Sequence, residues 1–309
     1  DLPLAISIFQ AGPIVGTGIA FVIGGAVLQL VGESPPLELP YFGELAPWQQ
    51  TFVYLGLPGI LLSVMILVIR EPRRRPFSRD PQSSSDTEEL INFYKGNFKT
   101  IFFHHLGNLS LVLTGYAFVF WSITFFVRVH GMNAAEASQI FGWIFIFFGP
   151  MGPFLVAYVA RVLSKRGHQD ANITAGMLGG LITIPAVLII QIAPSPFWAF
   201  VFYAPALAAV NSPFGIAAGA LPVITPPHLR ARVAAVYMLT GAVGMMFGPP
   251  LAGAFNEYIF PGVEGVRYSM ITMTCFFGIT GVVLLQLGRK HYALTMKNTE
   301  NWEKNSERE

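Results

Sequence analysis

Polar side chains inside the apolar stretches of this sequence are few, and several of them share a helical face. A long run without any charged residue contains Tyr203, Asn211 and Phe214, which fall on one face at helical spacing. His104 and Asn108 share a face in an earlier stretch. Because an amide without a partner is costly in hydrocarbon, we interpret these two faces as lining a substrate path. The alternative is that the two asparagines only join neighbouring helices.

Three aromatic residues follow Asn108 in the same stretch. Tyr116, Phe120 and Trp121 would form a wall suited to an amphiphilic substrate, because Tyr and Trp combine a large apolar ring with a polar edge. The alternative is that these rings face lipid. The predicted substrate-binding residues are therefore Asn108, Tyr116, Phe120, Trp121, Tyr203, Asn211 and Phe214.

Titratable groups that could carry a proton across a membrane are scarce. No Asp or Glu lies inside an apolar stretch, although proton-coupled transport normally needs a shielded acid. His104 and His105 are the nearest substitutes, because a shifted imidazole can titrate in the physiological range. The alternative places both histidines at the membrane interface. Glu257 could pair with Arg267 in an outer gate, or could lie at a solvated loop end.

Signals for enzyme chemistry are missing from the sequence. It contains no metal-ligand cluster, Walker-type loop, nucleotide fingerprint or nucleophile elbow, so neither an enzyme nor a cofactor or metal is indicated. The formal net charge of +2 is too small for a nucleic-acid-binding surface. The expected partners are a small amphiphilic solute, membrane lipids and protons.

The distribution of charge indicates a membrane protein. The composition is 53% hydrophobic and 12% charged. All charged residues lie outside eight apolar stretches, each close to or above the ~20 residues that a helix needs to cross a bilayer. We therefore predict an all-α polytopic membrane protein with eight transmembrane helices. The predicted spans are 5–31, 51–69, 101–127, 137–160, 172–193, 197–225, 233–255 and 268–288.

The positions of lysine and arginine predict the orientation. Of the 19 basic residues, 17 fall in the connections that follow the second, fourth, sixth and eighth spans. Since positive residues are retained in the cytoplasm, the linker 70–100 and the tail 289–309 should be cytoplasmic, in a multi-pass protein of the cell (inner) membrane. Within the linker, residues 88–94 are apolar on one side and predict a short helix at the membrane surface; the alternative is a solvated linker.

Glycine, proline and basic residues suggest gating elements. Gly12, Pro13 and Gly16 in the first span resemble Gly248 and Pro249 in the seventh, where small residues allow close helix packing or a moving gate. The basic residues Arg161, Lys165, Arg166, Arg230 and Arg232 could form cytoplasmic gate contacts, or could only set the topology.

Several motifs resemble one transporter family. They lie at residues 48–59, 71–74, 149–153, 158–167, 226–232, 248–250 and 265–268. Together they resemble the major facilitator superfamily and, within it, the spinster-like transporters. Residues 158–167 look like its basic loop motif, ending at Gly167, but Ala160 stands where the motif normally has Asp.

The resemblance implies both a fold and a function. The eight spans would be helices 5 to 12 of a twelve-helix fold, with the first four helices lacking. Residues 1–69 would end the N-terminal half, 70–100 would link the halves, 101–288 would form the C-terminal half and 289–309 the tail. The implied function is alternating-access, proton-coupled transport of a lipid-like solute. The alternatives are an organic-anion symporter, a drug exporter, or a non-transporting remnant or scaffold.

Overall fold

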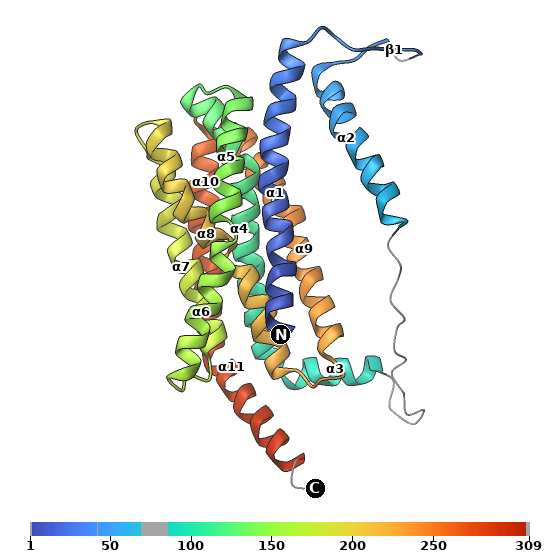
Figure 1. Ribbon diagram of the computed structural model, residues 1–309. Helices are drawn as coiled ribbons and strands as arrows, with labels where there is room; N and C mark the ends of the chain where they lie inside the picture. The colour runs from blue at the N-terminus through green and yellow to red at the C-terminus, as the bar shows by residue number, and fades with distance from the viewer. Residues whose placement is uncertain (1, 42, 69–85, 307–309) are drawn as a thin grey trace.

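All eight predicted spans are helical in the computed structural model (Figure 1). The structure describes residues 2–41, 43–68 and 86–306, and the side chains of 11–41, 43–68, 87–212 and 220–299. The elements are α1 (Leu2–Glu33), β1 (Glu38–Leu39), β2 (Gly43–Glu44), α2 (Pro47–Ile66), α3 (Asp86–Gly96), α4 (Phe98–His130), α5 (Ala134–Phe148), α6 (Met151–Lys165), α7 (Ala171–Gln191), α8 (Pro196–Ile224), α9 (Arg230–Ala254), the π-helical turn η1 (Phe255–Ile259), α10 (Gly265–Met273), the π-helical turn η2 (Thr274–Gly278) and α11 (Ile279–Ser306).

The lengths and apolar character of these helices suit a membrane. Seven helical segments within the described residues are long and apolar enough to cross one. The remaining predicted span is covered by α8, a helix of 29 residues whose side chains are only partly described. The prediction of an all-α polytopic membrane protein is therefore confirmed.

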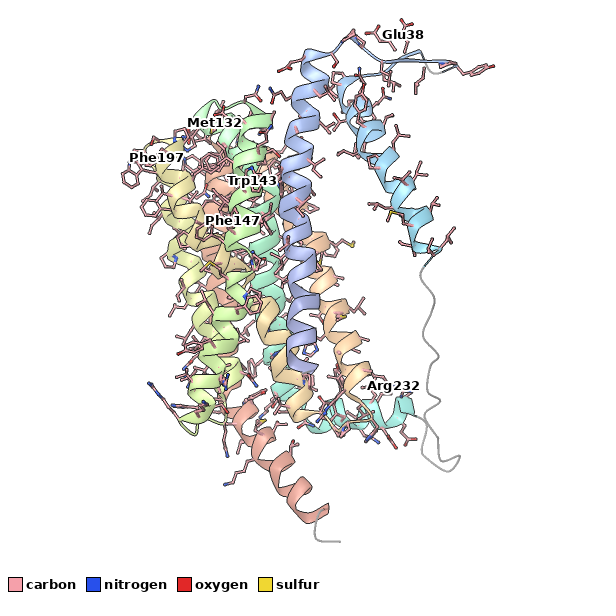
Figure 2. The ribbon with its side chains drawn as sticks, viewed as in Figure 1. Glu38, Met132, Trp143, Phe147, Phe197 and Arg232 are labelled. Carbon is pink, nitrogen blue, oxygen red and sulfur yellow. The ribbon has the colours of Figure 1, made fainter. Side chains whose placement is uncertain are left out.

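Large apolar side chains cover the outside of the bundle, as expected where the surrounding medium is hydrocarbon. Trp143 and Phe147 on α5 lie on this surface, as does Phe197 on α8 (Figure 2). All three side chains are more than half exposed, at 53%, 66% and 67%. Only lipid or another helix can cover such a surface without a large hydrophobic cost.

One predicted span is interrupted. We predicted a continuous helix over residues 137–160, and the structure instead has two helices, α5 and α6, that meet at Gly149 and Pro150. Pro150 has no backbone N–H, and its ring collides with the carbonyl one turn earlier, so an unbroken helix is disfavoured there. Together α5 and α6 still cover one membrane crossing, Ala134–Lys165.

The last helix continues beyond the predicted span into the tail. We predicted that the final span ends at residue 288, but α11 continues to Ser306 without a break. Tyr292, beyond the predicted end, is fully buried, and its hydroxyl donates to the Ala220 carbonyl of α8 at 2.7 Å. The beginning of the predicted tail therefore belongs to the packed bundle.

Helix α1 packs closely on α5, although more than 100 residues separate them. A Cβ at Gly18 would lie 2.6 Å from the Ile146 side chain and 2.9 Å from the Gly142 carbonyl oxygen. Ser138 Oγ also donates to the Phe21 carbonyl at 2.9 Å. Helix α2 stands away from the bundle in Figure 1 and is exposed over most of its length.

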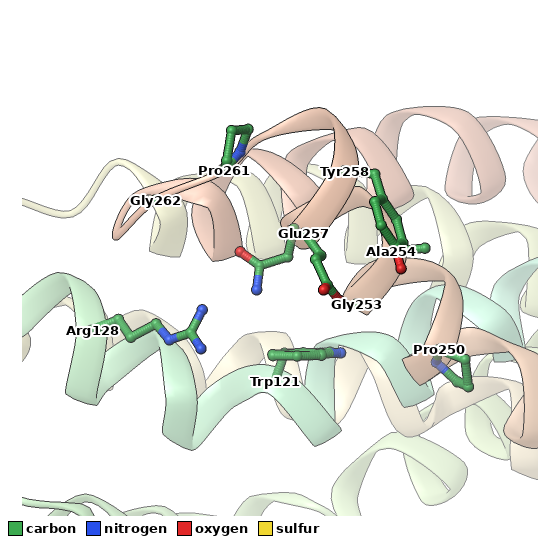
Figure 3. A pocket seen from close by; sticks show the side chains of 10 residues that line it. Trp121, Arg128, Pro250, Gly253, Ala254, Glu257, Tyr258, Pro261 and Gly262 are labelled. Atoms are coloured by element: carbon green, nitrogen blue, oxygen red, sulfur yellow. The ribbon is translucent and has the colours of Figure 1, made fainter.

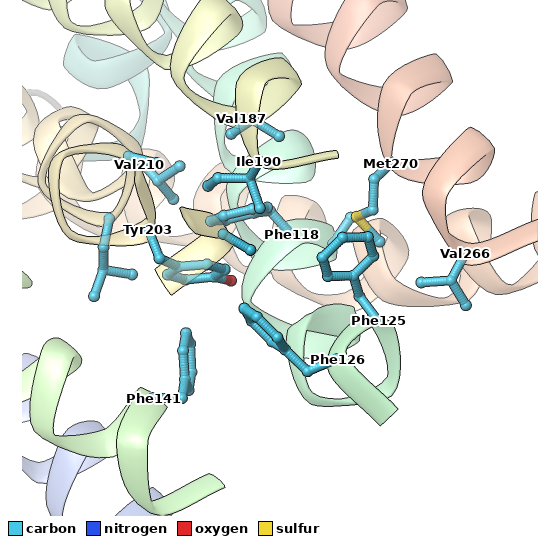
Figure 4. Packing of buried hydrophobic residues seen from close by; sticks show 14 of the residues in the cluster. Phe118, Phe125, Phe126, Phe141, Val187, Ile190, Tyr203, Val210, Val266 and Met270 are labelled. Atoms are coloured by element: carbon cyan, nitrogen blue, oxygen red, sulfur yellow. The ribbon is translucent and has the colours of Figure 1, made fainter. Parts of the chain in front are cut away.

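A cluster of buried aromatic and aliphatic side chains, the aromatic core, joins several helices of the bundle (Figure 4). The Tyr203 ring of α8 stacks on Phe118 of α4 with 4.7 Å between the ring centroids. Phe126 and Phe200 stack at 3.9 Å, and Phe141 of α5 meets Tyr203 edge-on at 4.9 Å. These rings tie α4, α5 and α8 together.

The linker contains a short helix, as predicted. Helix α3 lies at the end of the bundle that carries both chain termini (Figure 1). Phe93 and Tyr94 on α3 pack against buried apolar residues, and Glu89 Oε2 lies 3.3 Å from His228 Nε2. The basic residues at 70–79 lie outside the described residues.

Candidate functional site

The predicted substrate-binding residues differ in exposure, because some lie in the sealed aromatic core and others lie in more open positions. Tyr203 is fully buried in the aromatic core, and its hydroxyl has no hydrogen-bond partner within the described residues. Phe120 is 64% exposed and Tyr116 is half-buried, so these two side chains of α4 face more open surroundings. Phe214 lies on α8, but its side chain lies outside the described residues.

The two mid-span asparagines bond within their own helices. Asn108 Nδ2 donates to the His104 carbonyl at 2.8 Å, and Asn211 Nδ2 donates to the Leu207 carbonyl at 2.9 Å. Both side chains are buried. Asn108 Oδ1 has no partner in the described part of the chain. Neither of these bonds crosses to a second helix, so each amide nitrogen donates within its own helix.

The two histidines of α4 are enclosed by neighbouring helices. His104 is fully buried, and neither ring nitrogen has a hydrogen-bond partner among the described residues. The Tyr237 ring of α9 lies 5.5 Å from the His104 ring and 5.6 Å from the His105 ring. Tyr94 of α3 lies 6.2 Å from His105, and burial raises the pKa of its hydroxyl. Residues of α3, α4 and α9 therefore enclose the two rings. His105 Nδ1 lies 3.0 Å from the Ile101 carbonyl oxygen, whereas His105 Nε2 has no partner among the described residues.

A cavity opens where α4 and η1 lie side by side (Figure 3). Its volume is about 640 Å³, and it is lined by Trp121 and Arg128 of α4 and by Asn256 and Glu257 of η1. Trp121 Nε1 donates to the Pro249 carbonyl at 2.9 Å, which fixes the indole in the cavity wall. This cavity lies at the end of the bundle opposite to α3.

The predicted pairing of Glu257 with Arg267 is not observed. Arg267 Nη1 instead lies 2.9 Å from Glu264 Oε2, three residues earlier in the same segment. Such a local pair forms at little entropic cost, because both residues lie on neighbouring turns. Glu257 is exposed and faces the cavity with Arg128.

The predicted gating glycines differ in their surroundings. A Cβ at Gly248 would lie 2.6 Å from the Leu113 carbonyl oxygen, so α9 approaches α4 closely at that point, next to Pro249. At Gly12 and Gly16, no described atom lies within 4 Å of the Cβ position. Pro13 lies inside the continuous helix α1.

The predicted basic gate residues lie at one end of the bundle. Arg161, Lys165 and Arg166 are exposed, and Gly167 ends α6 with a φ of 85°. Arg230 Nε donates to the Thr225 carbonyl at 3.1 Å. Arg232, labelled in Figure 2, is half-buried near the start of α9.

One ion pair at this end was not predicted from the sequence. Arg289 Nε donates to Asp170 Oδ2 at 2.7 Å, and Thr174 Oγ1 donates to the same oxygen at 3.0 Å. Burial favours the neutral carboxyl, but these hydrogen bonds outweigh it and hold the pKa of Asp170 below its ordinary value. The sequence offered one signal for this pair. Asp170 lies directly before the fifth predicted span and Arg289 directly after the eighth, and their charges are opposite.

This arrangement defines the class of the molecule as a polytopic helical membrane protein. Within the described residues, no group of three or more His, Cys, Asp or Glu side chains is placed to hold a metal ion. Residues 1–249 match the Major Facilitator Superfamily, and the chain therefore belongs to that superfamily.

Within the superfamily, the chain is similar to a protein of the spinster type. The chain is 25% identical over 305 residues to Protein spinster homolog 3 of Danio rerio, and the match covers 90% of this chain. It spans 57% of the length of that relative.

Solved structures of a bacterial homologue of the human lysosomal transporter spinster share the fold. The inward-facing unoccupied form has a TM-score of 0.64 at 21% identity, covering 97% of this chain and 71% of the other. The inward-facing occupied form has the same TM-score at 22% identity, covering 96% and 70%.

Proposed function

We propose that this protein is a spinster-like secondary transporter that moves an amphiphilic, lipid-like solute by alternating access. The observation that carries the proposal is the superfamily match over residues 1–249, on helices whose packing resembles a transporter of known fold. The interruption at Gly149 and Pro150 and the π-helical turns η1 and η2 support it. Such breaks loosen the hydrogen-bond ladder and often occur at functional sites.

The solute path runs beside the open aromatic side chains of α4. Phe120 and Tyr116 offer apolar surface to an acyl chain, whereas Tyr203 is sealed in the core and acts through packing. Similarity to proteins of the spinster type supports this assignment of substrate class.

Protons are the coupling ion in this proposal. The support is the enclosed pair His104 and His105, because unsatisfied imidazole nitrogens in a buried site can exchange a proton when a conformational change admits water. Basic residues at the end that carries α3 and both termini support a cytoplasmic location for that end.

The test is uptake of a fluorescent lysophospholipid into proteoliposomes under an imposed pH gradient. We expect saturable uptake that a protonophore abolishes. His104→Gln should uncouple uptake from the gradient, while His168→Gln, in an exposed loop, should behave as wild type. Uptake equal to that of protein-free liposomes would contradict transport and favour a scaffold; gradient-independent uptake by the wild type would contradict proton coupling.

A further inference from the structure

The cavity between α4 and η1 carries two opposite charges that do not pair with each other. Arg128 projects from the last turns of α4, and Glu257 comes from η1 on the other wall (Figure 3). Within the described residues, neither side chain forms an ion pair or a hydrogen bond. The neighbouring charges Glu264 and Arg267 pair with each other instead. The cavity therefore offers one free cation and one free anion, both from the described part of the chain.

The other lining groups add recognition chemistry. Trp121 presents its indole ring in the same wall as Arg128, held by its hydrogen bond to the Pro249 carbonyl. An indole face attracts ammonium groups. Asn256 is only 8% exposed, and its Oδ1 has no hydrogen-bond partner in the described chain. That oxygen packs close to Gly265, because a Cβ built at Gly265 would lie 2.5 Å from it, so Asn256 contributes to the shape of the wall and not to ligand contacts.

Local backbone structure places these groups. Asn256 and Glu257 lie in a π-helical turn, where the wider ring of hydrogen bonds re-aims side chains that an α-helix would direct elsewhere. Arg128 lies just before Gly131, which ends α4 in the left-handed conformation with a φ of 67°. The cavity volume of about 640 Å³ is within the usual range for small-molecule sites.

We propose that this cavity binds a zwitterion that carries a phosphate or carboxylate and an ammonium group. The anionic group contacts the Arg128 guanidinium, which can bind it through two parallel hydrogen bonds. The ammonium group lies between the Glu257 carboxylate and the Trp121 ring. The site sits at the opposite end of the bundle from the basic loops and the enclosed histidines, so it is separate from the proposed proton-linked pair. Transport of the bound zwitterion would rest on the proposed function, whereas its binding to the cavity does not.

The same chemistry could come from a lipid head group or from a free zwitterion, and binding experiments distinguish the two. The purified protein is placed in nanodiscs of phosphatidylglycerol, in which no lipid carries an ammonium group. Isothermal titration calorimetry then measures binding of phosphocholine, choline alone and inorganic phosphate alone, and binding of a short-chain lysophosphatidylcholine.

We expect the zwitterions to bind saturably and the two single ions to bind at least tenfold more weakly. Arg128→Gln and Glu257→Gln should each weaken zwitterion binding at least tenfold. The controls Lys290→Gln and Glu136→Gln remove exposed charges outside this cavity and should bind as wild type. If lysophosphatidylcholine binds and free phosphocholine does not, the ligand is a lipid head group; if both bind equally, it is the free zwitterion.

Two results would overturn the inference: equal binding of zwitterion and single ions, or zwitterion binding unaffected by both cavity variants. Because both charged side chains are exposed, the variants should remain folded, which melting curves check. Binding without transport would refute the proposed function alone. Transport without variant-sensitive binding would refute this inference alone.

Discussion

Asp170 and Arg289 connect the start of α7 to α11, 119 residues apart in the chain. The carboxylate is mostly buried, with 14% of the side chain exposed, and it accepts hydrogen bonds from Arg289 and Thr174. We predict that Asp170→Asn or Arg289→Ala lowers the stability of the protein by about 1–3 kcal/mol, the usual cost of losing a charge-assisted hydrogen bond. Thermal unfolding in detergent measures this, with Lys290→Ala as the exposed control. An unchanged melting temperature in both variants would contradict a structural role for the pair.

The same pair predicts a pH dependence with a definite sign. Because the pKa of Asp170 is lower in the folded protein than in the unfolded chain, the carboxylate stabilises the fold above the ordinary pKa of about 3.9. This contribution is lost as the pH falls through the folded-state pKa. The difference in melting temperature between wild type and Asp170→Asn should therefore shrink below about pH 4.

Single residues were only partly predictable. The sequence identified Asn108 and Asn211 as buried polar groups, since an isolated amide in an apolar run stands out. It did not show that each amide would bond to its own helix, because that choice depends on the packing around it. The Glu257–Arg267 pairing failed because Glu264 lies one helical turn from Arg267 and forms the ion pair instead.

At the scale of helices, contact between α1 and α5 depends on glycine at one position. A side chain at Gly18 would collide with Ile146 and Gly142, whereas the Cβ position at Gly16 faces open space. We predict that Gly18→Ala destabilises the protein by about 1–3 kcal/mol, as overpacking does. Gly16→Ala, on the same helix, should be neutral or stabilising, because alanine favours helix by up to about 1 kcal/mol.

Melting temperature and the yield of monodisperse protein measure this pair of variants. Equal behaviour of Gly18→Ala and Gly16→Ala would contradict the close α1–α5 contact. Each of the two variants serves as the reference for the other, so the comparison needs no further control.

The existence of the helices could be predicted, but their irregularities could not. Charge segregation marks the spans because a charged residue in hydrocarbon is costly. Pro150 was visible in the sequence, yet proline also occurs inside the unbroken helices α1 and α7, so its presence alone does not predict a break. The turns η1 and η2 have no sequence signature, and the pairing of α1 with α5 depends on tertiary packing between distant segments.

At the scale of the whole molecule, the two ends of the bundle differ in chemistry. One end carries α3, both termini and the basic loops, and encloses His104 and His105. The other end carries the cavity with Arg128 and Glu257. In the proposed transporter, the end with the histidines would handle the coupling proton, and the end with Arg128 and Glu257 would bind the charged part of the solute.

The central claim is that the protein carries its solute by alternating access, and solute counterflow tests this most directly. Proteoliposomes are loaded with unlabelled lysophospholipid and diluted into a trace of the labelled form, without any ion gradient. A carrier predicts a transient accumulation of label above equilibrium, because outward movement of unlabelled solute returns the binding site for labelled solute. A monotonic approach to equilibrium without such an overshoot, or no flux beyond that of protein-free liposomes, would contradict the account.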